Sequence, residues 1–296
     1  MTQRFCHACV VGVVAAMFLI VTPTVATTAQ SIQTLPELLR STHVHGLAVA
    51  QSDSDRLLIA THNGLHALHI ETGIVVPVSE NRDDFMGFTP HPFDVAVLYA
   101  SGHLAGGGNL GFIMSTDDGK TWEMLSPGFD GPTDFHQMDV STLDPNVIYG
   151  AHHGMQASRD GGHTWQPVGP TPEGLIDLAA SAVAADRLYS ATRQGLLVSQ
   201  DGGRSWQTAH SLPQPASLVE TTADGTVYTF ILGSGFLRAQ EETLNWQALN
   251  NEFGDRYLLH LAVDPQDDNR LFGSTQENEL WVSLDGGRTW QLLGAP

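Results

Sequence analysis

An eight-residue phrase that occurs four times constrains the fold of this chain more than any other feature. The phrase reads Ser-x-Asp-x-Gly-x-Thr/Ser-Trp, and its copies begin at Ser115, Ser158, Ser199 and Ser283. Successive copies lie 43, 41 and 84 residues apart, so the last gap spans two periods. Residues 239–246 fill the missing place with a degenerate copy that keeps only Trp246. The chain is therefore built from repeats of about 40 residues.

Each repeat contains four short runs typical of β-strands. A further degenerate copy at residues 64–68 brings the number of units to six. In the third unit the runs cover residues 137–141, 147–150, 154–158 and 165–168. Gly, Asp, Asn and Pro separate these runs, and no segment after residue 42 has a long helical periodicity. Four short antiparallel strands per unit predict an all-β fold, a six-bladed β-propeller.

The phrase resembles the BNR or Asp-box repeat, which is found in sialidases and many other extracellular propellers. The resemblance covers residues 43–296 and implies that each phrase is the hairpin between the third and fourth strands of a four-stranded blade. In such a hairpin the Asp160 carboxylate accepts hydrogen bonds from its own turn, and Trp165 packs between neighbouring sheets. A Ca²⁺ loop is the alternative for these turns, but only Asp117-Asp118 offers two acids.

The first 29 residues have the features of an export signal. Arg4 precedes an apolar run of 13 residues from Cys9 to Val21, which is too short for a membrane anchor. Both cysteines, Cys6 and Cys9, lie in this segment, so we expect no disulfide in the mature protein. We therefore expect residues 1–29 to be a signal peptide, residues 30–42 a lead-in segment and residues 43–296 the propeller. The predicted product is exported, periplasmic or secreted, with no membrane insertion after cleavage.

The charge balance restricts the partners. The chain has 13 basic and 32 acidic residues, for a formal net charge of −19. Such a surface repels phosphate backbones and anionic lipids, and it attracts cations. We therefore exclude nucleic acid and membrane surfaces as partners. A metal ion, a small molecule, a glycan or another protein remains, and we expect the protein to be a monomer.

Histidines gather in two kinds of loop in the first three units. These loops enter the first strand or leave the second strand, the face where propellers of this kind usually bind ligands. Seven histidines lie there: His43, His45, His62, His103, His136, His152 and His153. His45 is equivalent to His136 in the repeat, and His62 to His152, while His43 and His45 are expected on one face of a strand. Neutral imidazoles near a carboxylate suit Zn²⁺ or Cu²⁺, so a divalent transition-metal site is the leading hypothesis.

Two other roles for these histidines stay open. Histidines at strand ends can hydrogen-bond a carbonyl group in the next blade, and repeated units inherit repeated residues. They can also transfer protons in a catalytic pocket.

A glycosidase of the sialidase-like propeller type is the enzymatic alternative. Residues 42–47 and 60–65, which read Thr-His-Val-His-Gly-Leu and Ala-Thr-His-Asn-Gly-Leu, resemble exported bacterial Asp-box proteins labelled glycosyl-hydrolase-like. Catalytic candidates are Asp84, Asp177 and Tyr257, and Asp139 and Glu220 are further carboxyls that could face the channel. The Arg-Ile-Pro phrase that supplies the first clamp arginine in sialidases is absent, which argues against a sialidase.

A non-catalytic scaffold that binds a protein or a glycan is the third possibility. Glycan binding would favour exposed aromatic side chains on the ligand face. Phe85, Phe135 and Tyr257 are the obvious candidates there. So few aromatic residues give only weak support to a glycan-binding surface.

Overall fold

A computed structural model describes residues 1–2 and 33–294. The predicted signal peptide therefore lies outside the described residues, apart from its first two. In the part of the chain that is described, 25 strands and one short helix form the fold. No helix among these residues has the length and hydropathy needed to cross a membrane.

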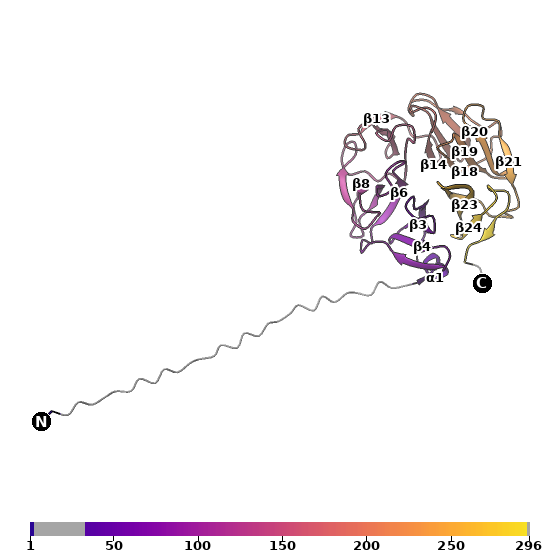
Figure 1. The fold of residues 1–296 in the computed structure, drawn as a ribbon. Coiled ribbons are helices and arrows are strands. Elements are labelled where there is room, and N and C mark those ends of the chain that lie inside the picture. Colours follow the sequence, from indigo (N-terminus) through magenta and orange to yellow (C-terminus); the bar gives the residue numbers. More distant parts are fainter. Residues whose placement is uncertain (3–32, 295–296) are drawn as a thin grey trace. The chain divides into compact units, whose positions relative to one another are not determined.

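The predicted six-bladed propeller is confirmed. Six antiparallel sheets are arranged in a ring, each built from a continuous stretch of chain in simple up-and-down order (Figure 1). Blade one contains β2 (Val44–Val49), β3 (Arg56–Thr61), β4 (Gly64–His69) and β5 (Ile74–Pro77). Blade two contains β6 (Asp84–Pro90), β7 (Leu98–His103), β8 (Phe112–Ser115) and β9 (Glu123–Ser126). Blade three contains β10 (Gln137–Val140), β11 (Ile148–Ala151), β12 (Met155–Ser158) and β13 (Gln166–Gly169).

The second half of the ring repeats this pattern. Blade four contains β14 (Leu175–Ala180), β15 (Leu188–Thr192), β16 (Gly195–Ser199) and β17 (Gln207–Thr208). Blade five contains β18 (Ala216–Thr221), β19 (Thr226–Ile231), β20 (Gly235–Gln240) and β21 (Gln247–Asn250). Blade six contains β22 (Leu258–Asp264), β23 (Asp267–Thr275), β24 (Leu280–Ser283) and β25 (Gln291–Leu292).

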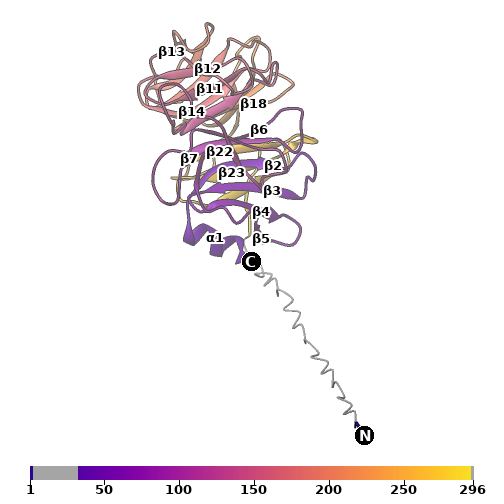
Figure 2. The ribbon, with the colours of Figure 1, turned by 90° about the vertical axis from the view of Figure 1, so that its left-hand side faces the viewer.

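Among the described residues, the first and last blades exchange no strand, and the ring closes through packing. The first strand of each blade contacts the first strand of the next, and β2 contacts β22 in the same way. The lead-in segment supplies β1 (Gln33–Thr34), which pairs with β5 as a fifth, outer strand of blade one. It also supplies α1 (Leu35–Ser41), which lies at this outer edge of the blade (Figure 2). The innermost strands therefore surround the axis, where the loops that enter them come together.

The core consists of apolar layers between neighbouring blades. Between blades two and three, Phe112, Phe135 and Trp165 form one aromatic cluster, with ring centroids 4.6 Å apart for Phe135 and Trp165. All three side chains are buried. The tryptophan of an Asp-box phrase thus packs against the preceding blade, as predicted, because a flat ring fills the gap between two twisted sheets.

The repeated phrase forms the hairpin between the third and fourth strands. Asp160 accepts hydrogen bonds from the Thr164 amide at 2.9 Å and from the hydroxyls of Thr164 and Ser158 at 2.7 and 2.8 Å. These bonds, the Thr164 amide first, lower the pKa of Asp160 to about 2. Asp117 makes the same contacts within its own turn, and Asp118 forms an ion pair with Arg56. Protein groups therefore already satisfy the one pair of acids that had suggested a Ca²⁺ loop.

Candidate metal centre

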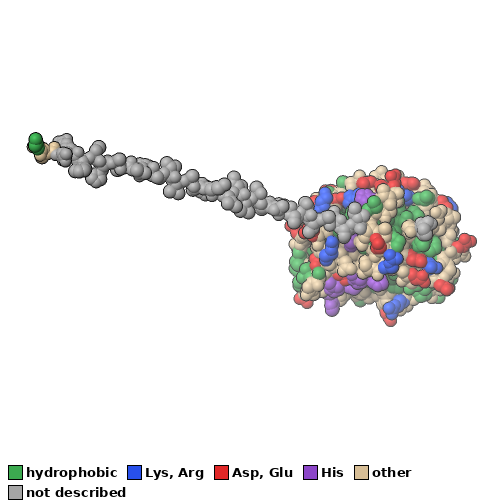
Figure 3. All heavy atoms as spheres, turned by 90° about the horizontal axis from the view of Figure 1, so that it is seen from below, with side chains coloured by type: hydrophobic (Ala, Val, Ile, Leu, Met, Phe, Trp, Pro, Cys, Tyr) green, Lys and Arg blue, Asp and Glu red, His purple; other side chains and the backbone are tan. Residues whose placement is uncertain are grey.

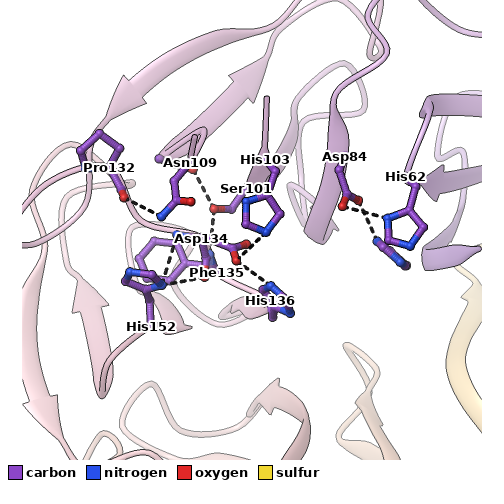
Figure 4. Close-up of polar contacts among 12 residues, drawn as sticks. His62, Asp84, Ser101, His103, Asn109, Pro132, Asp134, Phe135, His136 and His152 are labelled. Carbon is purple, nitrogen blue, oxygen red and sulfur yellow. Dashed lines mark hydrogen bonds and ion pairs between the residues drawn. The ribbon is translucent and has the colours of Figure 1, made fainter. Parts of the chain in front are cut away.

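Three side chains of blades one and two meet around the Asp84 carboxylate. His45 lies in β2, His62 follows β3, and Asp84 is the first residue of β6. His45 Nδ1 is 3.0 Å from Asp84 Oδ1, and His62 Nδ1 is 2.8 Å from Asp84 Oδ2. One ligand atom from each residue lies within 4.8 Å of the others. We call this group triad one; Figure 4 shows the His62 imidazole pointing toward the Asp84 carboxylate.

Two polar atoms of triad one are buried and face each other. His45 Nδ1 and Asp84 Oδ1 lie 3.0 Å apart as an ion-pair contact that is not aligned as a regular hydrogen bond. Burial, followed by the proximity of His62, lowers the pKa of His45 to about 4. The imidazole is therefore neutral at physiological pH and can offer a nitrogen lone pair to a metal ion.

A second group with the same composition lies around Asp134, at the boundary of blades two and three. His103 Nε2 is 3.1 Å and His136 Nε2 is 2.6 Å from Asp134 Oδ2. The other carboxylate oxygen, Oδ1, is buried and has no hydrogen-bond partner among the described residues. The ligand atoms again lie within 4.8 Å of one another. We call this group triad two.

The hydrogen bond to Asp134 raises the pKa of His136. A metal ion that binds at triad two therefore has to displace a proton that this bond favours.

The repeat explains the Asp–His pair that the two triads share, but not their third members, because His45 comes from the blade before that of its aspartate and His136 from the same blade as its aspartate. Asp84-Phe85 and Asp134-Phe135 stand at equivalent places, where the chain enters the first strand of blades two and three. Phe85 and Phe135 are fully buried and anchor these places in the core. Asp84 contacts His62, which follows the second strand of blade one. Asp134 contacts His103, at the end of the second strand of blade two.

Equivalent histidines make different contacts. His62 and His152 directly follow the second strands of blades one and three, but only His62 contacts the side chain of an aspartate, as His103 does in blade two. His152 Nδ1 instead lies 3.0 Å from the backbone oxygen of Asp134.

Four of the seven predicted histidines belong to the triads. His43, His152 and His153 do not. The His43 ring lies 5.8 Å from the His62 ring, and the His153 ring lies 4.2 Å from the His152 ring. Several histidine side chains lie side by side along one edge of the view in Figure 3. The structure therefore brings the predicted histidines to one face and unites only part of them with carboxylates.

The axial cavity, with a volume of about 160 Å³, adjoins both triads. Its lining includes three imidazoles and three carboxyls, from His45, His136, His260, Asp139, Asp177 and Glu220. Burial raises the pKa of Asp139 to about 6 and that of Asp177 to about 8, and it raises the pKa of Glu220 well above its ordinary value. Burial also lowers the pKa of His260 to about 4. Neutral groups therefore dominate this cavity near neutral pH.

Two of these carboxyls connect neighbouring inner strands. Asp177 accepts hydrogen bonds from the amides of Leu178 and Val219, both at 2.9 Å. Asp139 does the same with the amides of Val140 and Ala180, at 2.8 and 2.7 Å. Each aspartate thus holds the first strand of the next blade, so both carboxyls have a clear structural role.

Tyr257, the third catalytic candidate, lies apart from the triads. It lines a different cavity of about 490 Å³, together with Phe253 and Arg256 among others. Arg256 is paired with Glu279 at 2.6 Å and with Glu277 at 3.2 Å. Tyr257 therefore has no free arginine beside it that would complete a sialidase-like centre.

Sequence reasoning missed Asp134 and gave His260 no role. The signal for Asp134 was present, because Asp-Phe occurs at the start of both the second and the third unit. In the structure Asp84 is the first residue of β6, whereas Asp134 lies three residues before β10.

Comparisons with known proteins agree with the fold. The BNR/Asp-box repeat family matches residues 281–292, the last hairpin of the ring. No curated protein sequence matches the chain.

Many solved structures are similar. A GH74 enzyme from Niastella koreensis has a TM-score of 0.61 at 16% identity, over 85% of this chain and 45% of that one. The GH74 xyloglucanase from Xanthomonas campestris has a TM-score of 0.57 at 19% identity, over 86% of this chain and 45% of that one. YCF48 bound to D1 peptide has a TM-score of 0.55 at 16% identity, over 91% and 87% of the two chains. This chain spans less than half the length of the two GH74 enzymes. At such identities the likeness establishes the propeller alone.

Proposed function

Taking the chain as a β-propeller built from BNR/Asp-box repeats, we propose that it binds a divalent transition metal, Zn²⁺ or Cu²⁺, at triads one and two. One observation carries the proposal: the same set of two histidines and one aspartate recurs at the boundaries of consecutive blades, with ligand atoms within 4.8 Å. Hydrogen bonding between blades alone does not require the same three residue types twice.

The geometry of triad one suits a small ion. Metal–ligand distances near 2 Å place two ligands of a tetrahedral Zn²⁺ site about 3.3 Å apart. The nitrogen–oxygen distances of 3.0 and 2.8 Å at Asp84 need only a small outward shift to reach that spacing. An ion would replace the direct contact between the buried His45 Nδ1 and Asp84 Oδ1 atoms with a bond to each of them.

The ligand atoms indicate which metal ions can bind. Two imidazoles and one carboxylate are borderline ligands that suit Zn²⁺ and Cu²⁺ better than Ca²⁺ or Mg²⁺, which prefer oxygen alone. Three protein ligands leave at least one coordination position open, as in catalytic zinc sites. The net charge of −19 raises the local concentration of cations. Each triad is thus suited to an ion that can also bind an external ligand.

Titration calorimetry of tag-free, chelator-treated protein with Zn²⁺ and Cu²⁺ tests the proposal. We expect the wild-type protein to bind two ions per chain. His62→Ala and His103→Ala should each bind one. Both side chains are about half exposed, at 46% and 42%, so their removal should leave the fold intact. His163→Ala is the matched control, because His163 is exposed and lies in an Asp-box hairpin outside both triads. Unchanged stoichiometry and affinity in both triad variants would exclude the proposal.

A glycosidase is the second candidate, and its support is the likeness to GH74 enzymes. The raised pKa of Asp177, to about 8 because of burial, also suits a general acid. Against this, Asp139 and Asp177 are engaged in bonds between blades, in a cavity of about 160 Å³. A screen of aryl glycosides in the presence of chelator distinguishes the two: turnover that disappears in Asp177→Asn would favour the glycosidase.

A further inference from the structure

A cavity of about 520 Å³ lies beside triad two, and its side chains differ in charge from the rest of the protein. We call it the Arg193 cavity. Its lining residues are His136, Gln137, Ala151, His152, His153, Thr171, Pro172, Gly174, Leu175, Ile176 and Arg193. Three imidazoles and one guanidinium contribute to it, and no carboxylate does. In a chain with 32 acidic and 13 basic residues, such a lining favours an anion.

Arg193 is free to bind a ligand. Its guanidinium makes no hydrogen bond or ion pair with the residues that the structure describes, and its side chain is exposed. Other arginines of the ring are engaged: Arg270 pairs with Asp264, and Arg256 pairs with Glu279. A planar guanidinium without a partner is suited to bind a carboxylate or phosphate through two hydrogen bonds.

The repeat places Arg193 on the same face as the histidines. The turn from Thr192 to Gly195 reads Thr-Arg-Gln-Gly, and the turn from Thr61 to Gly64 reads Thr-His-Asn-Gly. In both, the threonine hydroxyl donates to the glycine carbonyl, at 2.8 and 2.9 Å. Arg193 therefore stands where blade one has His62.

His136 and His152 connect the cavity to triad two. His136 lines the cavity and lies 2.6 Å from Asp134 in triad two. His152 Nδ1 is held 3.0 Å from the backbone oxygen of the same aspartate. That contact orients the His152 ring and leaves Nε2 available to a ligand. Figure 4 shows His136 and His152 on either side of the Asp134–Phe135 segment.

We infer that the Arg193 cavity is an oxyanion subsite, which binds the carboxylate or phosphate group of a small molecule whose other end reaches the metal ion at triad two. The contact between the ligand and the metal ion rests on the proposed function. Binding of the oxyanion needs only Arg193 and the imidazoles beside it, so it can be measured without metal.

The test is an NMR titration of chelator-treated protein with malonate and, separately, with inorganic phosphate. We expect shifts of the Arg193 and His152 signals, and an affinity at least about tenfold weaker in Arg193→Gln. Arg40→Gln is the matched control, because Arg40 is exposed and lies in α1, outside the cavity. The probe that binds more tightly identifies the class of oxyanion. Absence of binding by either probe, or equal affinity in Arg193→Gln, would overturn the subsite.

A second titration separates this inference from the proposed function. With Zn²⁺ bound, malonate should bind more tightly than in metal-free protein, and His103→Ala should remove only this gain. Arg193→Gln should still bind two Zn²⁺ ions. Oxyanion binding without any Zn²⁺ binding would leave the subsite standing and refute the metal proposal. An equal malonate affinity with and without bound Zn²⁺ would refute the link to triad two.

Discussion

The Asp84 carboxylate holds one imidazole nitrogen at each of its oxygens: His45 Nδ1 lies 3.0 Å from Oδ1, and His62 Nδ1 lies 2.8 Å from Oδ2. Two nitrogen ligands and a carboxylate gathered in this way are the donor set that Zn²⁺ and Cu²⁺ prefer. This arrangement motivates the first prediction.

Asp84→Asn should leave the metal-free protein about as stable as wild type and should halve the stabilisation by metal. The amide keeps the shape of the carboxylate but loses its charge and one acceptor. At a free Zn²⁺ concentration of 100 times Kd, each site adds about 2.7 kcal/mol, so two sites add about twice as much. Urea unfolding with and without Zn²⁺ measures this. An equal gain in wild type and Asp84→Asn would contradict the assignment of Asp84 as a ligand.

Two tryptophans at equivalent positions should respond differently to the same substitution. Trp165 Nε1 donates to the Gly162 carbonyl at 3.1 Å, whereas Trp206 Nε1 is buried without a hydrogen-bond partner among the described residues. Trp165→Phe should therefore cost about 1 kcal/mol more than Trp206→Phe. Trp165→Ala should cost about 3–5 kcal/mol, because a buried ring is removed from between two blades. Thermal denaturation of the three variants tests this, and a Trp165→Ala melting temperature equal to wild type would contradict the packing described.

The two glycines of one hairpin offer a matched pair. Both have positive φ angles, 72° for Gly161 and 92° for Gly162. A Cβ atom on Gly161 would meet only Asn146 Oδ1, at 3.8 Å, but one on Gly162 would collide with the Phe112 ring. Gly161→Ala should cost about 1–2 kcal/mol from backbone strain alone, and Gly162→Ala clearly more. Equal losses in chemical denaturation would show that the Phe112 ring moves aside freely.

The ring and its hairpins could be predicted because the repeated phrase fixes the register of every unit. Gly, Asp and Trp in that phrase have local roles, so sequence order alone reveals them. The loops around the axis are different. Register shifts between Val44 and Gly46 and between Met86 and Thr89 show that both first strands are bulged there. A bulge turns side chains away from strict alternation, so His43 and His45 could not be placed from their spacing.

Contacts between blades could not be predicted from the sequence either. The degenerate repeat of blade five lacks the hairpin aspartate, yet it supplies Glu241, which is 3% exposed. Glu241 accepts a hydrogen bond from the Ser181 hydroxyl, and another from the Ala182 amide at 2.8 Å, both in blade four. Nothing in the order of residues signals a bond that spans 60 positions.

Glu241→Ala should therefore destabilise the fold by about 3 kcal/mol. It leaves the Ser181 hydroxyl and the Ala182 amide without their acceptor, and it removes the carboxylate 3.9 Å from Arg187. Glu242→Ala is the control, since Glu242 is exposed, and it should change stability by less than about 0.5 kcal/mol. Similar losses in both variants would mean that Glu241 has no special role.

The hairpin carboxylates should give the protein an acid-dependent stability. Hydrogen bonds from Thr164 lower the pKa of Asp160 to about 2, below its unfolded value near 4. The contribution of Asp160 is therefore present above about pH 4 and is lost as pH falls towards 2. Asp160→Asn should be less stable than wild type at pH 6, and the difference should shrink between pH 4 and pH 2. Urea unfolding at these values checks this; a difference independent of pH would contradict it.

Anomalous diffraction from crystals soaked in Zn²⁺ tests most directly whether metal ions bind at the two triads. At the zinc absorption edge we predict two peaks per chain, one bounded by His45, His62 and Asp84 and one by His103, Asp134 and His136. Peaks only at scattered surface carboxylates, or none at either triad, would contradict the account.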